Sequence, residues 1–327
     1  MRGSRRWAGL GICGALLWPR AWPAFAAGDA FQVWLDDLRR EARGQGIGTR
    51  TLDAALTGVQ PIQAVLDADT RQPERQITFA EYRRRVVSQE RIERGRQLLV
   101  EHRALLAQVQ ARYGVPAPVL MALWGIESHF GDRQGGYPVF AALATLAYDG
   151  RRAAFFRREL LNALRIVDRG YADPAEMQGS WAGAMGQCQF MPSTYLGYAV
   201  DLDGNGHPDI WRSLPDVFGS MANYLARSGW ETGYLWGREV MVPPGLDDAG
   251  TGLGHKASLA TWRRRGVRLP DGAGLPVAAI PASLLRMDDG DGTSYLVYRN
   301  FNVLMTWNRS TYFGVSVGLL SDSLRDG

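Results

Sequence analysis

The chain has 327 residues, of which 46% are hydrophobic and 21% are charged. Its length predicts about two domains, and its composition supports a buried core and excludes a disordered chain. The formal net charge is +4, but four arginines and no acidic residue lie in residues 1–26. Taking those four from the 37 Lys and Arg leaves 33, which equals the number of Asp and Glu. The neutral remainder lacks the basic surface of a nucleic-acid-binding protein.

Residues 1–26 have the pattern of a secretory signal peptide. Arginines lie within residues 2–6, residues 8–18 are apolar, and Ala24-Phe25-Ala26 fits a signal-peptidase site. The apolar stretch is shorter than the about 20 residues that span a bilayer, and Cys13 lies inside it, where no lipid attachment is expected. We therefore expect a periplasmic protein without a membrane span or a lipid anchor. A retained N-terminal helix is the alternative.

Most of the chain shows the three-to-four-residue apolar spacing that is typical of amphipathic helices. The segment Ser213-Leu214-Pro215-Asp216 has the pattern of a helix N-cap. We predict helices over residues 31–43, 88–113, 116–130, 138–148, 151–169, 213–228 and 311–324.

Residues 233–292 differ from the rest, because they are rich in Gly, Pro and Asp and contain short apolar runs at 239–242 and 277–280. Such runs predict strands, and β-branched and aromatic residues follow over 295–304. We predict a mainly α (α+β) fold. It would divide into a signal peptide (1–26), a helical region and core (27–232), a small β-containing insertion (233–300) and a C-terminal segment that returns to the core (301–327).

A glutamate lies on the apolar face of the predicted helix 116–130. Glu127 follows Leu123 by four residues and Trp124 by three, so the three share one face. An ionised carboxylate would be poorly solvated there, which predicts a raised pKa for Glu127. Such a carboxyl group suits general acid catalysis of glycosidic cleavage. The alternative is a glutamate that reaches solvent or pairs with an arginine such as Arg133.

Residues 179–193 form a glycine-rich segment. Its glycines disfavour an ordinary helix and let the backbone approach a ligand closely. Ser180 and Gln189 can hydrogen-bond sugar amides and hydroxyls, and Trp181 and Phe190 offer apolar faces to sugar rings. The alternative is a tight structural loop.

Residues 201–212 resemble a calcium loop, with oxygen ligands at the first, third and fifth positions and glycine at the sixth. The twelfth position holds Arg212 instead of glutamate, and Asp216 could replace that carboxylate. A turn without a metal is the alternative. The proposed ligands of one structural calcium ion are Asp201, Asp203, Asn205, His207 through its carbonyl, and Asp216.

Other chemistry has little support in the sequence. The four histidines include no pair at zinc-ligand spacing. Residues 250–254 do not follow a predicted strand, so they do not form a dinucleotide-binding fingerprint, and we expect no organic cofactor. Cys188 has no histidine near it in the sequence and is predicted to be a packed thiol.

Together these segments resemble the lytic murein transglycosylase B family, glycoside hydrolase family 103, from about residue 79 to residue 322. The matching stretches are 124–128, 179–193, 201–211, 219–224, 300–301 and 308–310. The resemblance implies a lysozyme-like helical core that binds peptidoglycan glycan strands. It also implies a lytic transglycosylase that cleaves the β-1,4 bond between N-acetylmuramic acid (MurNAc) and N-acetylglucosamine (GlcNAc), leaving 1,6-anhydroMurNAc ends.

The resemblance implies roles for individual residues. Glu127 would be the single catalytic acid/base. Ser180, Gln189 and Tyr224 match positions that line the sugar cleft, and Asn308 matches one beside the catalytic acid. Trp307 stands where the best-described branch of the family has tyrosine, so we treat it as a substrate-binding candidate with no tyrosine-specific role.

A single acid is consistent with this chemistry, because ordinary glycosidases need two carboxylates flanking the bond. The nearest acids in the sequence, Asp132 and Asp149, do not share the helical face of Glu127. A hydrolytic muramidase on the same fold and a non-catalytic peptidoglycan-binding scaffold are the alternatives. We expect a monomer.

Overall fold

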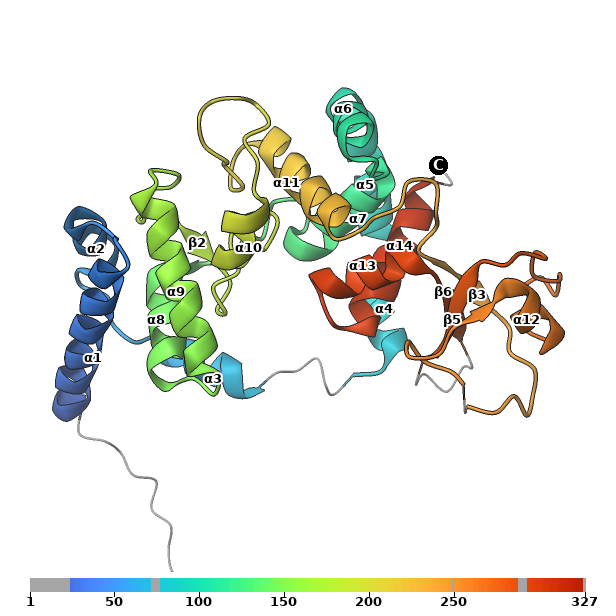
Figure 1. Cartoon of the computed structure of the whole chain (residues 1–327), viewed down its shortest axis with the longest axis horizontal. Coiled ribbons are helices and arrows are strands. Elements are labelled where there is room, and N and C mark those ends of the chain that lie inside the picture. Colours follow the sequence, from blue (N-terminus) through green and yellow to red (C-terminus); the bar gives the residue numbers. More distant parts are fainter. Residues whose placement is uncertain (1–23, 72–76, 249, 288–292, 326–327) are drawn as a thin grey trace, which may run out of the picture.

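The computed structural model describes residues 24–71, 77–248, 250–287 and 293–325. Most of them are helical, which confirms the predicted fold class (Figure 1). The helices are α1 (Ala24–Gly44), α2 (Thr49–Leu56), α3 (Gln63–Arg71), α4 (Phe79–Val86), α5 (Gln89–Glu101), α6 (Arg103–Tyr113), α7 (Ala117–Ser128), α8 (Val139–Asp149), α9 (Ala153–Asp168), α10 (Pro192–Tyr198), α11 (Leu214–Arg227), α12 (Leu259–Arg264), α13 (Arg299–Trp307) and α14 (Thr311–Arg325).

The strands are short and form two antiparallel sheets. They are β1 (Tyr137–Pro138), β2 (Gln178–Gly179), β3 (Gly237–Val240), β4 (Ala257–Ser258), β5 (Pro281–Arg286) and β6 (Ser294–Val297). The larger sheet has the strand order β3-β6-β5-β4, and β1 pairs with β2. The β1–β2 pair joins the segment after α7 to the start of the glycine-rich segment, with Tyr137 opposite Gly179.

Several element predictions need correction. The predicted helix 88–113 is two helices, because the chain breaks at His102, which has φ −98° and ψ 17°. The run 277–280 is not a strand, and its Val277 is 77% exposed; the strand β5 begins directly after it. Residues 295–304 divide between β6 and α13. Residues 1–23, which hold most of the predicted signal peptide, lie outside the described residues, and Ala24–Ala26 belongs to α1.

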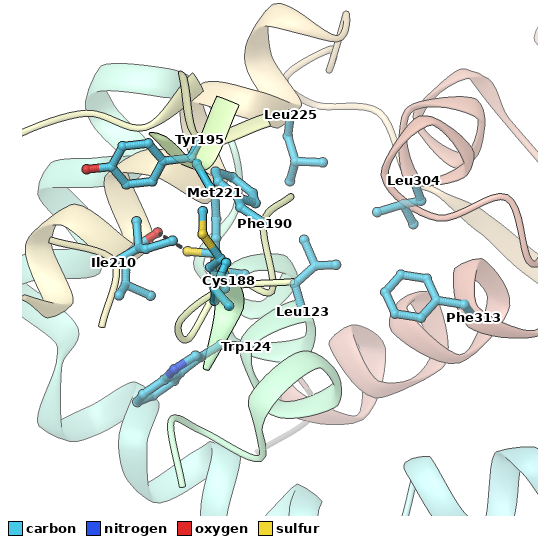
Figure 2. Packing of buried hydrophobic residues seen from close by; sticks show 14 of the residues in the cluster. Leu123, Trp124, Cys188, Phe190, Tyr195, Ile210, Met221, Leu225, Leu304 and Phe313 are labelled. Carbon is cyan, nitrogen blue, oxygen red and sulfur yellow. Dashed lines mark hydrogen bonds between the residues drawn. The ribbon is translucent and has the colours of Figure 1, made fainter. Parts of the chain in front are cut away.

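Helix α7 lies at the centre of the main core. Eight of its twelve residues are buried, and α5, α6, α11 and α14 pack around it. A helix that is apolar on all sides is stable only in such a buried position. Leu123 and Trp124 of α7 belong to one buried cluster with Cys188, Leu304 and Phe313, which come from later parts of the chain (Figure 2). The core therefore fixes α7 with respect to the glycine-rich segment and the last two helices.

The larger sheet separates the main core from a second, smaller one. Successive side chains of a strand point to opposite faces, and both faces of this sheet are buried. Leu285 and Tyr295 face the main core, whereas Leu284 and Leu296 pack in the second core with Trp262 of α12. The sheet and α12 thus form a β-containing unit at one end of the molecule, away from α8 and α9 (Figure 1).

Among the described residues, no helix combines the length and the apolar character needed to cross a bilayer.

Candidate active site

The last turn of α7 holds Glu127. The helix ends at Ser128, and the two following residues, His129 and Phe130, have positive φ values of 52° and 58°. Their N–H groups both turn back to the Trp124 carbonyl, which closes the helix end. The left-handed pair reverses the chain directly after Glu127, which is half-buried. The backbone therefore fixes this carboxylate at the edge of the core.

Trp307, the last residue of α13, contacts Glu127. Its indole Nε1–H donates a hydrogen bond of 2.6 Å to Oε1 of Glu127, across 180 positions of sequence. An indole can donate but not accept, so it can orient the carboxylate and stabilise its ionised form but cannot exchange a proton with it. Sequence analysis treated Trp307 as a substrate-binding candidate, whereas the structure places it against the proposed catalytic acid.

An aromatic cluster holds Trp307 in place. The Tyr224 ring lies edge-on to the indole with centroids 4.9 Å apart, and the Phe190 ring lies 5.3 Å away. The Tyr224 hydroxyl donates to the carbonyl of Thr306, the residue before Trp307, at 2.8 Å. Burial raises the pKa of Tyr224, so this hydroxyl stays neutral and remains a donor at physiological pH. The glycine-rich segment, α11 and α13 thus meet at Glu127.

The glycine-rich segment folds back on itself. Met185 forms antiparallel bridges with Gly179 and with Phe190. Gly186 has φ +61°, and a Cβ there would lie 2.6 Å from the carbonyl oxygen of Ile210. Any larger residue would therefore push the loop away from residues 210–211. The glycines were predicted to let the backbone approach a ligand closely. At Gly186 the backbone does make a close approach, but to Ile210 of the same chain.

The side chains predicted to contact sugar also support this loop. The Ser180 hydroxyl accepts a hydrogen bond from Ala184 N–H at 3.1 Å. Gln189, with φ 49°, donates from Nε2 to the carbonyls of Gln134 and Gly186. Both residues are half-buried, so each combines a structural role with partial exposure. Their contacts with sugar stay predictions.

Asn308 follows Trp307 and is exposed, and its Oδ1 accepts a hydrogen bond from Ser310 N–H. Asp132, the acid that follows Glu127 most closely in the sequence, forms an ion pair of 2.6 Å with Arg94 of α5. The Arg94 hydrogen bond lowers the pKa of Asp132. Asp132 is therefore ionised and engaged with α5 at neutral pH.

Sequence analysis missed Gln187, which is buried beside the proposed catalytic residue's helix. Its Oε1 accepts a hydrogen bond from Trp124 Nε1 at 2.8 Å. The sequence carries no signal for this contact, because it does not show which of the two glutamines in the glycine-rich segment, Gln187 or Gln189, is buried. Cys188, the next residue, is fully buried as predicted, and burial raises its thiol pKa, which excludes a reactive thiolate.

The acidic loop, which comprises residues 201–212, and the nearby Asp216 bring three of the predicted metal ligands together. One carboxylate oxygen from each of Asp201, Asp203 and Asp216 lies within 4.8 Å of the others. Asn205 and His207 lie in the same loop, where the Asn205 side chain accepts from His207 N–H. Their part in binding a metal stays a prediction.

Backbone donors surround these carboxylates. Asp201 accepts from the N–H groups of Gly204, Asn205 and Gly206, which lower its pKa, the Gly206 bond most. Asp216 is fully buried and accepts from the N–H groups of Leu202, Asp203 and Asp209.

The donor set fits a calcium ion. Burial raises the pKa of Asp216, and the neighbouring Asp203 charge raises it further. Three close carboxylates, one of them desolvated, are costly without a cation, and hard oxygen ligands of this kind suit Ca²⁺. The Ser213 hydroxyl that caps α11 accepts the backbone N–H of Asp216, so Asp216 joins the helix start through its backbone and the loop through its carboxylate.

The chain is similar to known proteins over most of its length. The family described as "Transglycosylase SLT domain" matches residues 30–322. Membrane-bound lytic murein transglycosylase B of Escherichia coli K12 is 33% identical over 250 residues, which cover 74% of this chain and 66% of that relative.

Solved structures show the same similarity in three dimensions. SltB3 from Pseudomonas aeruginosa, crystallised with NAG-NAM-pentapeptide, is 42% identical with a TM-score of 0.88, over 91% of this chain and 80% of its own. A second SltB3 structure contains NAG-anhNAM-pentapeptide. The Escherichia coli lytic transglycosylase Slt35 in complex with calcium is 30% identical with a TM-score of 0.75, over 92% of this chain and 94% of its own.

The matched region includes Glu127, the glycine-rich segment, the acidic loop and Trp307. It therefore takes in every element of the candidate site. The chain belongs to the transglycosylase SLT domain family.

Proposed function

We propose that this protein is a peptidoglycan lytic transglycosylase with Glu127 as its single acid/base. The observation that carries the proposal is the Glu127 carboxylate at the end of α7, half-buried and held by the Trp307 indole beside an aromatic cluster. The named relatives act on or bind fragments of peptidoglycan, which supports the choice of substrate. Ser180, Gln189, Tyr224, Trp307 and Asn308 are the proposed sugar-contacting residues.

In this mechanism Glu127 first donates its proton to the oxygen between MurNAc and GlcNAc, and the bond from that oxygen to the MurNAc anomeric carbon breaks. Positive charge then develops on the sugar, where the substrate's own 2-acetamido group can stabilise it. The ionised Glu127 next takes the proton of the MurNAc C6 hydroxyl, whose oxygen bonds the anomeric carbon. Glu127 ends protonated, no water is consumed, and the product is a 1,6-anhydroMurNAc end.

The Trp307 hydrogen bond is suited to the second half of this cycle. It stabilises the carboxylate that forms when Glu127 gives up its proton, and it fixes the direction of the side chain. Because the indole nitrogen is a donor only and has no acceptor lone pair, it cannot compete with the sugar for the proton of Glu127.

Mass spectrometry of purified sacculi digested with the protein tests the proposal. We expect glycan fragments that end in 1,6-anhydroMurNAc. Reducing MurNAc ends, 18 Da heavier because they contain the elements of water, would instead identify the hydrolytic muramidase. Binding to sacculi without release of fragments would identify the scaffold.

We further propose that the acidic loop binds one structural calcium ion through Asp201, Asp203, Asn205, His207 and Asp216. The three gathered carboxylates support this, and so does the calcium complex of Slt35. The ion would stabilise the loop and the start of α11 without taking part in the reaction. We also propose a monomer that is exported to the periplasm by residues 1–26, where its substrate lies.

A further inference from the structure

Both the oxygen and the nitrogen of the Gln187 side-chain amide form hydrogen bonds within the protein. Gln187 is only 7% exposed, its Oε1 accepts from Trp124 Nε1 at 2.8 Å, and its Nε2 donates to the Trp211 carbonyl at 2.8 Å. Its backbone N–H donates to the Ile210 carbonyl at 2.9 Å. A buried amide whose oxygen and nitrogen both have partners is a structural connection and is not free to bind a ligand.

This connection reaches the helix of the proposed catalytic acid. Trp124 lies three residues before Glu127, on the same side of α7 and one turn away. The Trp124 ring lies edge-on to Phe130, 5.5 Å away, and to Phe218, 5.1 Å away. These apolar contacts hold α7 in the core by close packing, but apolar attraction by itself does not specify the direction of the indole N–H.

A hydrogen bond does have direction. The Trp124–Gln187 bond therefore fixes the rotation of α7 relative to the glycine-rich segment, which forms part of the candidate site. At its other end Gln187 is held by residues 210–211, near the end of the acidic loop. A rotation of α7 would shift the Glu127 carboxylate away from Trp307 and from a bound sugar.

We propose that Gln187 is a positioning residue for Glu127, acting through Trp124. This inference rests on the proposed function, since it assigns the bond a purpose in placing the acid/base. A displacement of about 1 Å in a catalytic group can cost about 100-fold in rate. The inference therefore predicts an effect on kcat that exceeds any effect on substrate affinity.

The test is Gln187→Met, which keeps the length and burial of the side chain and removes both polar ends. We expect kcat on purified sacculi to fall about 10-fold or more, with KM within about 2-fold. The matched control is Gln110→Met, because Gln110 also bonds α7, at the Ala117 N–H at the opposite end of the helix. That variant should keep wild-type kcat even if its melting temperature falls. An unchanged kcat in Gln187→Met, or an equal loss in both variants, would overturn the inference.

Trp124→Phe removes the other partner of the same bond. If one hydrogen bond carries the effect, the double variant with Gln187→Met should lose no more kcat than the more impaired single variant. Losses that multiply would show that the two residues act separately and would contradict the inference.

A measurement without turnover separates this inference from the proposed activity. The indole N–H signal of Trp307 in a nitrogen-15 NMR spectrum, assigned with Trp307→Phe, reports its bond to Glu127. We expect this signal to shift in Gln187→Met and to stay in place in Gln110→Met. An unmoved signal in both would refute the positioning role, whereas a shift in an enzyme that does not cut sacculi would refute only the proposed activity.

Discussion

The acidic loop and the candidate active site are built in opposite ways. In the loop, carboxylates from residues 201–216 accept hydrogen bonds from backbone N–H groups of the same short segment. At the active site, Glu127 is held by a side chain from the far end of the sequence, and Trp307 is itself held by Tyr224 and Phe190. The first kind of structure depends on contacts within its own segment, whereas the second depends on the packing of distant elements. We therefore expect changes in the loop to alter stability and changes around Glu127 to alter rate.

The Glu127→Gln substitution should cause the largest loss of activity. The amide has nearly the same shape but cannot supply or accept the proton, and general acid catalysis is worth about 100-fold to 10,000-fold. We expect release of muropeptides to fall by about 1,000-fold or more, with the melting temperature within about 2 °C of wild type. Turnover at the wild-type rate would remove Glu127 from the mechanism.

Trp307→Phe should have the next largest effect. It keeps an aromatic ring against Tyr224 and removes the donor to Glu127, so we expect kcat to fall by about 10-fold to 100-fold. The ionised carboxylate loses stabilisation, so the pH above which kcat/KM falls should move upward. A pH profile of the initial rate checks this.

The matched control is Trp230→Phe. Trp230 is buried whereas Trp307 is half-buried, and the Nε1 of Trp230 has no hydrogen-bond partner in the described part of the chain. The Trp230→Phe substitution should leave the pH profile of the initial rate unchanged. Identical profiles for the two variants would mean that the contact with Glu127 has no catalytic effect.

Calcium should affect stability and leave the rate unchanged. At 100 times its dissociation constant an ion that binds only the folded state stabilises it by about 2.7 kcal/mol. For a chain of this size we expect the melting temperature to rise by about 4 °C and chelator to reverse the rise. Asp216→Asn should abolish the response, while Asp271→Asn, in a turn of the β-containing unit, should keep it. A melting temperature that ignores both calcium and chelator would count against the site.

The smallest expected effect comes from the surface pair of Arg94 and Asp132. The lowered pKa of Asp132 means that the pair stabilises the fold above the unfolded-state pKa and that this contribution is lost as pH falls through the folded-state pKa. Because Asp132 is 52% exposed, solvent screening limits the contribution to less than about 1 kcal/mol. Urea unfolding of Asp132→Asn at pH 7 and at pH 3 should show a small loss of stability at pH 7 that is smaller at pH 3. A loss of equal size at both would exclude the ion pair as its cause.

The same contrast between local and distant contacts explains what the sequence could predict. The helical fold follows from apolar spacing, and the gathering of Asp201, Asp203 and Asp216 follows from a spacing within one short segment. The end of α5 at His102 did not follow, because the apolar spacing continues through the break. The strand predicted at 277–280 was wrong because apolar composition alone does not distinguish an exposed run from the strand beside it.

The candidate site was predicted in its parts but not in its assembly. The position of Glu127 on an apolar helical face and the match of Asn308 to the family could both be read from the sequence. The hydrogen bond between Trp307 and Glu127, and that between Gln187 and Trp124, depend on how α13 and the glycine-rich segment pack on α7. Neither contact leaves a periodic or spacing signal in the chain.

The order of synthesis gives the distance between Glu127 and Trp307 a further meaning. A ribosome that has added Glu127 must still add 180 residues before the indole that bonds this glutamate exists. An unfinished chain, or one cleaved before α13, therefore contains Glu127 without the Trp307 indole that bonds it. An enzyme that cuts the cell's own wall would in this way gain full activity only when the whole chain has been made and folded.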